Sequence, residues 1–314
     1  TDSPTAGTSN RHGRPRQVDS EHSPRAMEDA VQYRDSANLD SSQVTSSSGG
    51  AGGSGGRLAV GGVGGIIIVL LAMFLGFDPS ALVGGTASGP QQQTDEYSRC
   101  RTGADVQTNR DCRFVAYTNS IQAYWGKAMS GYQPTKTHIF TGQVSTGCGT
   151  ATTAVGPFYC PSDRVVYLDT GFFDQLTKQL GAQGGDAAEA YVIAHEYGHH
   201  ISNLTGVLDK VQQAGNQTGA NSPQVKLELQ ADCYAGVWMA NATKSATSPI
   251  AAITGEDVAR AADAASSVGD DRIQQQSSGR VDRESWTHGS AAQRQNWLAT
   301  GFNSGDPTKC NTFG

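Results

Sequence analysis

Residues 195–200 read HEYGHH, a hexapeptide whose residue types and spacing suit metal-dependent hydrolysis. His195 and His199 are four residues apart, so on a helix both imidazoles lie on one face and can hold one metal ion. Glu196 lies off that stripe, too far round to be a ligand but close enough to reach a water molecule at the metal. Zinc is the usual metal at such a pair, with the glutamate as general base. The motif therefore predicts a zinc metallohydrolase.

The sequence around the hexapeptide predicts the helix that this chemistry requires. Gly184 and Gly185 interrupt the preceding segment, and Asp186 with Glu189 three residues later forms a capping-box pattern. The run AAEAYVIAHEYGHHISNL then keeps its apolar residues at helical spacing. The alternative is a surface helix with solvated histidines, but such a helix has no need of the apolar YVIA directly before the pair.

A catalytic zinc takes three protein ligands and keeps one open position, so a third ligand must come from elsewhere in the chain. In NSPQVKLELQADCYAGVWMA, Ser222 is a plausible N-cap and Pro223 a favoured first helical residue. Glu228 and Asp232 follow four residues apart in apolar company, where carboxylates are generally paired or metal-bound. We predict Glu228 as the third ligand and Asp232 as the carboxylate that orients a ligating imidazole. His200 points ~100° away round the helix from its neighbour and is expected to be structural.

A third segment, WTHGSAAQRQNW at residues 286–297, contains two residues that could stabilise the transition state. His288 and Arg294 could each steady the negative charge that develops when water attacks a peptide carbonyl. Ser290 is a plausible N-cap for a helix that begins at Ala291. The alternative is a capped surface helix with a lone histidine, and the residue pattern alone does not separate the two.

These motifs together resemble the bacterial neutral zinc metallopeptidase family. The resemblance is carried by AYVIAHEYGHHISNL, LELQADCYAGVW, GPFYCPSDRVVYLDTGFFDQL, THGSAAQRQNWLATGF and the terminal CNTFG, and it extends over roughly residues 30–314. It implies a zinc peptidase in which His195, His199 and Glu228 hold the metal and Glu196 is catalytic.

A more distant similarity is to the membrane metalloendopeptidases that process CAAX proteins. It rests on the E-x-x-x-D of Glu228 and Asp232, and on the T-H motif at His288 followed by Arg294. In those enzymes the downstream histidine and arginine are thought to assist the transition state, which implies the same roles here. Gly289 stands where those enzymes usually carry proline, so this part of the pattern departs from theirs.

Residues 58–77, LAVGGVGGIIIVLLAMFLGF, contain no charged side chain and predict one transmembrane helix, because twenty residues suffice to cross ~30 Å of hydrocarbon. A cleaved signal peptide is the alternative, but the long polar head and the length of the apolar run disfavour it. Arg34 and Arg57 precede the segment and Asp78 follows it. This charge bias predicts a cytoplasmic N-terminus and a catalytic domain outside the cytoplasmic membrane.

The six cysteines all follow the apolar segment, which suggests an oxidising compartment and disulfide bonds. No C-x-x-C occurs, so a cysteine zinc site is not expected. Free buried thiols are the alternative. The expected pairs are Cys100 with Cys112 and Cys148 with Cys160, which close short loops, and Cys233 with Cys310, which ties the carboxyl-terminal tail to the Glu228 helix.

The chain divides into four parts by composition. Residues 1–57 are rich in Ser, Gly, Asp and Arg and are expected to be a disordered head. The transmembrane helix follows at 58–77, a linker at 78–98, and a globular metallopeptidase domain at 99–314. The net charge of −6, without a basic patch, argues against nucleic-acid binding.

Within the globular part, THIFTG, GPFYC and RVVYLD predict short strands, the last two joined as a hairpin. Helices are expected over CRFVAYTNSIQAYWGKAM, around both candidate metal-ligand segments, over TGEDVARAADAASSVG, and over AAQRQNWLATG, which Gly301 would end. The expected fold class is α+β: a zincin-like domain with a small antiparallel sheet and a mainly helical body. RVVYLD is the expected edge strand, which would bind a peptide main chain by β-addition.

The sequence thus predicts a membrane-anchored, zinc-dependent endopeptidase that cleaves protein or peptide substrates outside the cytoplasmic membrane. The alternative from another class is a non-catalytic cell-envelope binding or scaffold protein that retains a structural zinc site. Hydrolysis of non-peptide amides would use the same atoms. The pattern does not indicate a substrate sequence or an oligomeric state.

Overall fold

The computed structural model describes residues 1, 31–48, 92–94, 96–215 and 217–314. The predicted transmembrane segment, residues 58–77, and most of the predicted linker lie outside these ranges. Within them, no helix has both the length and the apolar character needed to cross a bilayer. The described part is α+β, as expected from the sequence.

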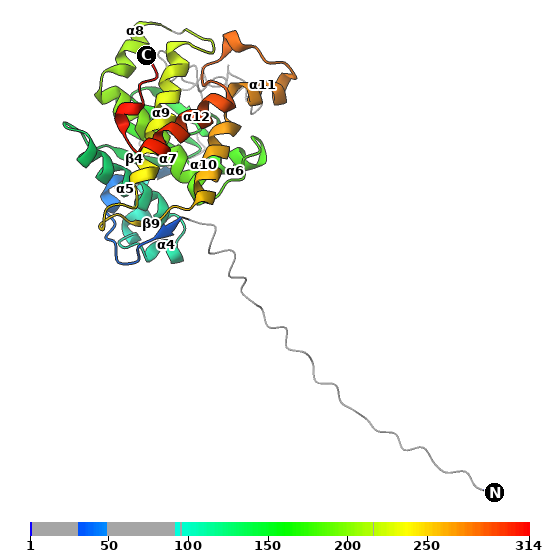
Figure 1. Ribbon diagram of the computed structural model, residues 1–314. Helices are drawn as coiled ribbons and strands as arrows, with labels where there is room; N and C mark the ends of the chain where they lie inside the picture. The colour runs from blue at the N-terminus through cyan, green and yellow to red at the C-terminus, as the bar shows by residue number, and fades with distance from the viewer. Residues whose placement is uncertain (2–30, 49–91, 95, 216) are drawn as a thin grey trace.

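The helical body surrounds the HEYGHH segment. Helix α7 packs against α9 and α10, and α12 packs against α9 and α10 in turn; Figure 1 shows α9 alongside α12. The helices are α4 (Asp105–Thr108), α5 (Cys112–Ala128), α6 (Gly171–Lys178), α7 (Asp186–Leu204), α8 (Val207–Gln213), α9 (Pro223–Asn241), α10 (Gly255–Ser267), α11 (Asp270–Ser278) and α12 (Ala291–Ser304), with 3-10 turns η1 (Ser41–Gln43), η2 (Glu96–Arg99), η3 (Thr153–Val155), η4 (Arg283–Ser285) and η5 (Pro307–Lys309).

A five-stranded sheet lies beside this body in the order β3-β2-β4-β8-β7. Two small sheets, β1 with β9 and β5 with β6, complete the strands that the structure describes. Helix α7 contacts β7 and β8, so the HEYGHH helix runs next to one edge of the main sheet. The strands are β1 (Gln32–Tyr33), β2 (Val44–Ser48), β3 (Gln92–Thr94), β4 (Lys136–Thr141), β5 (Gln143–Thr146), β6 (Gly149–Thr152), β7 (Phe158–Cys160), β8 (Val165–Asp169) and β9 (Ile250–Ala252).

The main sheet is mixed, whereas we expected a small antiparallel one. Strands β2, β4 and β8 are mutually parallel, and only the outer strands β3 and β7 run antiparallel to their neighbours. The β7–β8 hairpin is confirmed, but RVVYLD is not the edge strand. Strands flank β8 on both sides, and its four residues from Val166 to Asp169 are buried, as expected for an inner parallel strand whose two faces are both covered. The edge strands are β3 and β7.

Residues 31–48 correct the predicted disordered head. Strand β2 pairs in parallel with β4, with Val44 opposite Thr137, and the apolar side chains of Val31 and Leu39 are buried in the main core. The Arg34 guanidinium donates hydrogen bonds to the backbone carbonyls of the loop 243–250. A segment with few large apolar residues is therefore held by backbone pairing and by one arginine, as well as by the burial of those few apolar side chains.

Two predicted helix ends differ in the structure. Helix α7 begins after Gly185, an N-cap residue without a side chain, so the predicted cap at Asp186 does not form, and the Glu189 carboxylate pairs with Arg113 in the interior. Helix α12 continues past Gly301 and ends at Gly305, which has the left-handed conformation that glycine favours. The predicted caps at Ser222, at Ser290 and at Thr254 with Asp257 are confirmed.

Glycines allow the helices that carry the site to pack closely against one another. A Cβ on Gly198 of α7 would lie 2.7 Å from the Cα of Ala231 on α9. On the other side of α9, a Cβ on Gly236 would lie 2.1 Å from the backbone oxygen of Leu298, and one on Gly301 would lie 1.9 Å from the backbone oxygen of Cys233. The backbones of α7, α9 and α12 can approach this closely only because these positions lack side chains.

All three expected disulfides form, which confirms the predicted pairing. Cys233–Cys310 spans 77 residues and anchors the carboxyl-terminal tail to α9, one residue after Asp232. In the chain-entropy model, a disulfide that closes a loop of that length stabilises the folded protein by about 4 kcal/mol. The other two bonds are Cys100–Cys112 and Cys148–Cys160, and no free cysteine occurs in the described chain.

Candidate metal centre

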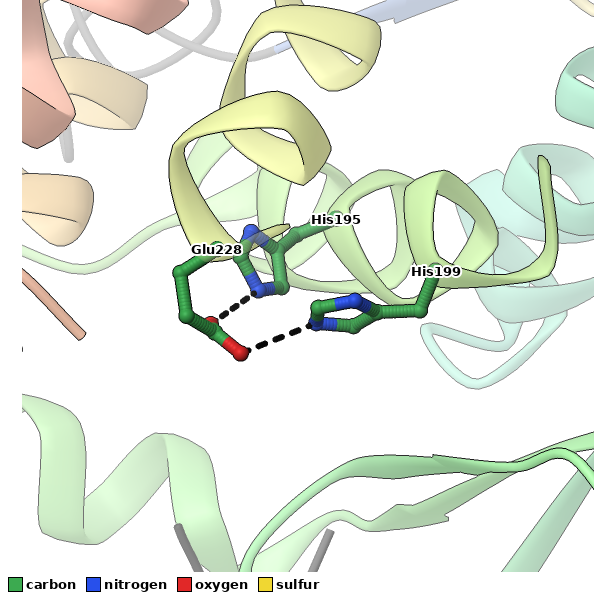
Figure 2. Close-up of side chains that lie close together, drawn as sticks. All are labelled: His195, His199 and Glu228. Carbon is green, nitrogen blue, oxygen red and sulfur yellow. Dashed lines mark hydrogen bonds and ion pairs between the residues drawn. The ribbon is translucent and has the colours of Figure 1, made fainter. Parts of the chain in front are cut away.

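Helix α7 presents His195 and His199 on one face, one turn apart, as the spacing predicts. Their ring centroids lie 4.8 Å apart, and the Nε2 atoms of both rings face the Glu228 carboxylate (Figure 2). Nε2 of His195 lies 3.2 Å from Oε2 of Glu228, and Nε2 of His199 lies 3.4 Å from Oε1. One ligand atom from each of the three residues lies within 4.8 Å of the others.

Helix α9 brings Glu228 to this position. Glu228 is three residues before Ala231, the residue against which Gly198 of α7 packs, so the closest approach of the two helices falls beside the site. Gly198 itself stands directly before His199 in the sequence. The approach of α7 and α9 therefore aligns the histidine pair with a carboxylate that lies 29 to 33 positions further along the chain.

The three side chains fit a zinc ion. Two ligands that each lie 2.0–2.1 Å from a tetrahedral metal are separated by about 3.3 Å, which is the spacing of the imidazole and carboxylate atoms here. Oε1 of Glu228 is buried and has no hydrogen-bond partner in the described chain. Such an orphaned carboxylate oxygen is costly unless a cation or proton satisfies it. Two imidazoles and one carboxylate form a donor set that leaves a fourth position open.

Asp232 lies directly behind His195 and fixes its orientation, as predicted. Oδ1 of Asp232 lies 2.8 Å from Nδ1 of His195, so this nitrogen carries the proton and Nε2 presents its lone pair to the metal position. Burial opposes ionisation of Asp232, but Arg294 and His195 outweigh it and lower the pKa of the carboxyl. The hydroxyl of Tyr191 donates a further bond of 2.6 Å to the same oxygen.

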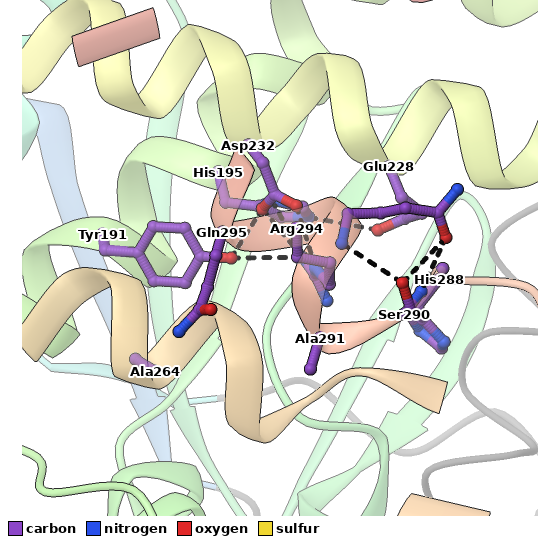
Figure 3. Close-up of polar contacts among 12 residues, drawn as sticks. Tyr191, His195, Glu228, Asp232, Ala264, His288, Ser290, Ala291, Arg294 and Gln295 are labelled. Atoms are coloured by element: carbon purple, nitrogen blue, oxygen red, sulfur yellow. Dashed lines mark hydrogen bonds and ion pairs between the residues drawn. The ribbon is translucent and has the colours of Figure 1, made fainter. Parts of the chain in front are cut away.

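Arg294 is part of this network (Figure 3). Its Nε donates to Oδ2 of Asp232 at 2.8 Å, and its Nη2 donates to Oδ1 at 2.9 Å and to the hydroxyl of Tyr191 at 3.1 Å. The guanidinium therefore supports the carboxylate that orients His195. The predicted contact between Arg294 and a developing oxyanion stays a prediction, although the residue does line the cleft.

His288 also lines the cleft, on the loop that precedes α12. Its Nδ1 lies 3.1 Å from Oδ1 of Asp270, and Oδ2 of Asp270 accepts the backbone N–H groups of Thr287, His288 and Gly289 at 2.7–2.9 Å. Burial works against the charge on Asp270, but His288 and these backbone donors lower the pKa of the carboxyl. The arrangement directs Nδ1 of His288 to Asp270 and leaves Nε2 for another partner.

Glu196 lines the same cleft and has no side-chain hydrogen bond to any residue that the structure describes. Burial raises the pKa of its carboxyl, although the imidazoles of His199 and His195 act in the opposite direction. Burial also opposes ionisation of Glu228, but there the same two imidazoles prevail and hold the pKa well below its usual range. The two carboxyls thus differ: Glu228 is held as a carboxylate, and Glu196 is the more basic group.

His200 is structural, as expected. It is fully buried and points away from the metal position, with Nε2 donating to the backbone oxygen of Gln133 at 2.7 Å. Its Nδ1 accepts the hydroxyl of Tyr159 at 2.9 Å. Since Tyr159 lines the cleft, His200 holds one wall of the site from behind.

Sequence reasoning missed Tyr191 and Asp270. Tyr191 precedes His195 by four residues, so the helical stripe that marked the histidines could have indicated it as well. Asp270 lies 18 residues before His288, at the start of another helix, and no periodic pattern links the two.

The fold and this site define a candidate zinc centre of the H-E-x-x-H type with a glutamate third ligand. The chain matches the family model described as "Putative neutral zinc metallopeptidase" over residues 29–313, and it belongs to that family.

Relatives from several bacteria are similar over most of their length. The uncharacterized proteins Rv2575 of Mycobacterium tuberculosis and Mb2605 of Mycobacterium bovis are each 48% identical over 254 residues, which cover 77% of this chain and 85% of theirs. The uncharacterized protein YpfJ of Escherichia coli is 41% identical over 260 residues, covering 79% of this chain and 85% of its own. No solved structure matches the chain, so the zincin-like fold stays a prediction.

Proposed function

We propose that this protein is a zinc-dependent endopeptidase. The observation that supports it best is the convergence of His195, His199 and Glu228, with one buried carboxylate oxygen that no hydrogen bond satisfies, beside a Glu196 that has no hydrogen-bond partner among the described residues. A structural zinc site has no use for such a free carboxylate and is usually closed by a fourth ligand. The site therefore favours the enzyme over the scaffold alternative.

The chemistry divides between the metal and the side chains. Zinc, when bound, would polarise the scissile carbonyl and lower the pKa of a coordinated water molecule. The Glu196 carboxylate accepts a proton from the attacking water as the new C–O bond forms at the carbonyl carbon. It then delivers that proton to the amine nitrogen as the C–N bond breaks. His288, held at Nδ1 by Asp270, is placed to stabilise the developing oxyanion through Nε2.

An extended peptide would bind along β7. This strand forms one edge of the main sheet, and its residues Phe158 and Tyr159 line the cleft. The backbone groups on its outer side can therefore pair with a substrate main chain beside the metal position, by β-addition. The predicted binding mode is retained, but on β7 in place of RVVYLD.

We further propose that the catalytic domain works outside the cytoplasmic membrane. Its three disulfides support an oxidising compartment. Anchoring through residues 58–77 remains a prediction, since these residues lie outside the described ranges. Residues 31–48 share the compartment of the domain because they are part of its sheet, which conflicts with the predicted cytoplasmic position of that part of the head.

The test compares the zinc-loaded protein with Glu196→Gln on a mixed peptide library, with products detected by mass spectrometry and zinc content measured for both. Removing a general base typically slows turnover by about 10²- to 10⁴-fold, while the ligands stay in place and zinc is retained. The exposed Glu284→Gln is the matched control and should cleave like the unmodified protein. Equal cleavage by Glu196→Gln would refute the mechanism.

A further inference from the structure

The cleft over the candidate metal centre has apolar walls. They come from α6, α8, α9 and α10. Within the described chain, the charged or titratable side chains among its lining residues are those of the metal and catalytic set already described, together with tyrosines. The apolar residues that matter here are Phe172, Leu176, Val192, Leu208, Ala264 and Val268.

The size of the cleft suits one large side chain. Its volume is about 120 Å³, a space that includes the metal position. An apolar cavity of about 150 Å³ in another protein is large enough to bind benzene, so a leucine or phenylalanine side chain is of the right order. The walls are also firm, because Leu176, Ala264 and Phe172 are themselves buried and packed against the core.

The walls discriminate by charge because, outside the metal and catalytic set, none of their described side chains is charged, and Gln212 is the polar one besides the tyrosines. A carboxylate or ammonium group that enters an apolar cavity loses its hydration without a compensating partner, whereas an apolar side chain gains from leaving water. Of the charged groups that line the cleft, Arg294 is engaged with Asp232, and Glu196 lies beside the metal position, where it faces the scissile bond in the proposed mechanism. They are not available to neutralise a charged substrate side chain.

We infer that the cleft selects peptides that place a bulky apolar side chain, of the leucine or phenylalanine class, beside the scissile bond, and that it rejects acidic and basic side chains there. This inference rests on the proposed peptidase function.

Val268 is the position that tests it best. It lies at the end of α10, in the wall of the cleft, and is partly exposed, so a longer polar side chain can be accommodated without filling the core.

The experiment uses blocked alanine-glycine octapeptides that differ at one position, which carries Leu, Phe, Asp or Lys. The unmodified zinc-loaded protein should favour the Leu and Phe peptides over the Asp peptide by at least about tenfold in kcat/KM. Val268→Lys should reduce that preference about tenfold, by adding a partner for aspartate. The exposed Val281→Lys makes the same change outside the cleft and should leave the preference unaltered.

Binding gives a second readout that does not need turnover. The Glu196→Gln variant should bind the Leu and Phe peptides more tightly than the Asp peptide in calorimetric titrations. Equal binding, or equal kcat/KM for all four peptides, overturns the apolar selection while leaving the peptidase function intact. Selective binding without any cleavage by the unmodified protein would instead overturn the proposed function and support the apolar cleft.

Discussion

Arg294 grips Asp232 through two hydrogen bonds, of 2.8 Å from Nε to Oδ2 and 2.9 Å from Nη2 to Oδ1, deep inside the domain. Asp232 in turn holds Nδ1 of His195. The chain of contacts therefore runs from α12 through α9 to a candidate metal ligand on α7. Through these contacts Arg294, near the carboxyl terminus, helps to orient the imidazole of His195, about a hundred positions earlier in the chain.

The first prediction concerns this chain of contacts. Arg294→Lys keeps the positive charge but loses the two-point grip on Asp232. We expect zinc affinity to fall by about 10- to 100-fold, the usual effect of disturbing a group that orients a metal-bound histidine. Competition with a chelator of known affinity measures it, and the exposed Arg280→Lys is the control. Unchanged zinc affinity with reduced kcat would instead favour a direct role of Arg294 at the oxyanion.

The second prediction concerns the approach of α7 to α9. A methyl group at Gly198 would meet the Cα of Ala231 at 2.7 Å and the backbone oxygen at 2.9 Å, neither of which can rotate away. Gly198→Ala should therefore lower the free energy of unfolding by about 1–3 kcal/mol, despite the better helix propensity of alanine, and weaken zinc binding. Urea denaturation and the same chelator competition measure the two effects.

Gly255→Ala supplies the matched control for that change. Gly255 is also a helical glycine, but a Cβ there would meet no atom within 4 Å. We expect no loss of stability at this position. If Gly198→Ala is as harmless as Gly255→Ala, the close contact between α7 and α9 does not constrain the site.

The residues that converge at the candidate metal centre could be predicted in pairs because the geometry within each pair is local. His195 with His199, and Glu228 with Asp232, are each one helical turn apart, so a helical period suffices to place each pair on one face. The cysteines could be paired for a similar reason, since two of the three bonds close loops of 12 residues. The helical period gives no information on how one helix packs against another. That depends on glycines such as Gly198, whose role appears only when both backbones are seen.

The predictions from the sequence failed mainly where polar groups that lie far apart in the chain pair with one another. Strand β2 reads VTSSS, which has little hydrophobic content, yet Thr45 and Ser47 both hydrogen-bond the ring of His138 on β4 at 2.8 Å. Asp270 likewise holds His288 through bonds to backbone N–H groups that any residue would offer. Neither relationship has a sequence pattern, because one partner contributes only its backbone or a small hydroxyl.

The third prediction uses the lowered pKa of Asp270. A carboxyl whose pKa is lower in the folded than in the unfolded state stabilises the fold at pH values above its unfolded pKa of about 3.9. That contribution is lost as the pH falls through the folded pKa, because the proton then binds in both states. Asp270→Asn, which cannot ionise, lacks the contribution at every pH.

The difference in stability between the unmodified protein and Asp270→Asn should therefore be largest at pH 5–7 and shrink below about pH 4. Urea denaturation at several pH values measures it. Asp209→Asn removes an exposed carboxyl on α8 and should show no such difference. A difference that stays constant down to pH 3 would mean that the loss does not come from the charge of Asp270 but from the hydrogen bonds that its oxygens accept.

The fourth prediction concerns the side of the membrane on which residues 31–48 lie. One crossing by residues 58–77 would place ~30 Å of hydrocarbon between β2 and β4, whereas the two strands pair along their length. A single crossing and this pairing exclude one another within one molecule. We therefore expect residues 31–48 and the catalytic domain to face the same compartment.

Ser36→Cys and Lys210→Cys, made separately in the full chain, test this expectation in intact cells with a membrane-impermeant maleimide. Both positions are exposed, one in the amino-terminal segment and one on α8, and the six native cysteines are joined in disulfides. Equal labelling from one side supports the sheet as drawn in Figure 1. Labelling of Lys210→Cys with protection of Ser36→Cys, reversed only on lysis, would show that β2 does not pair with β4 in the cell and that the chain crosses once, as its charge pattern predicts.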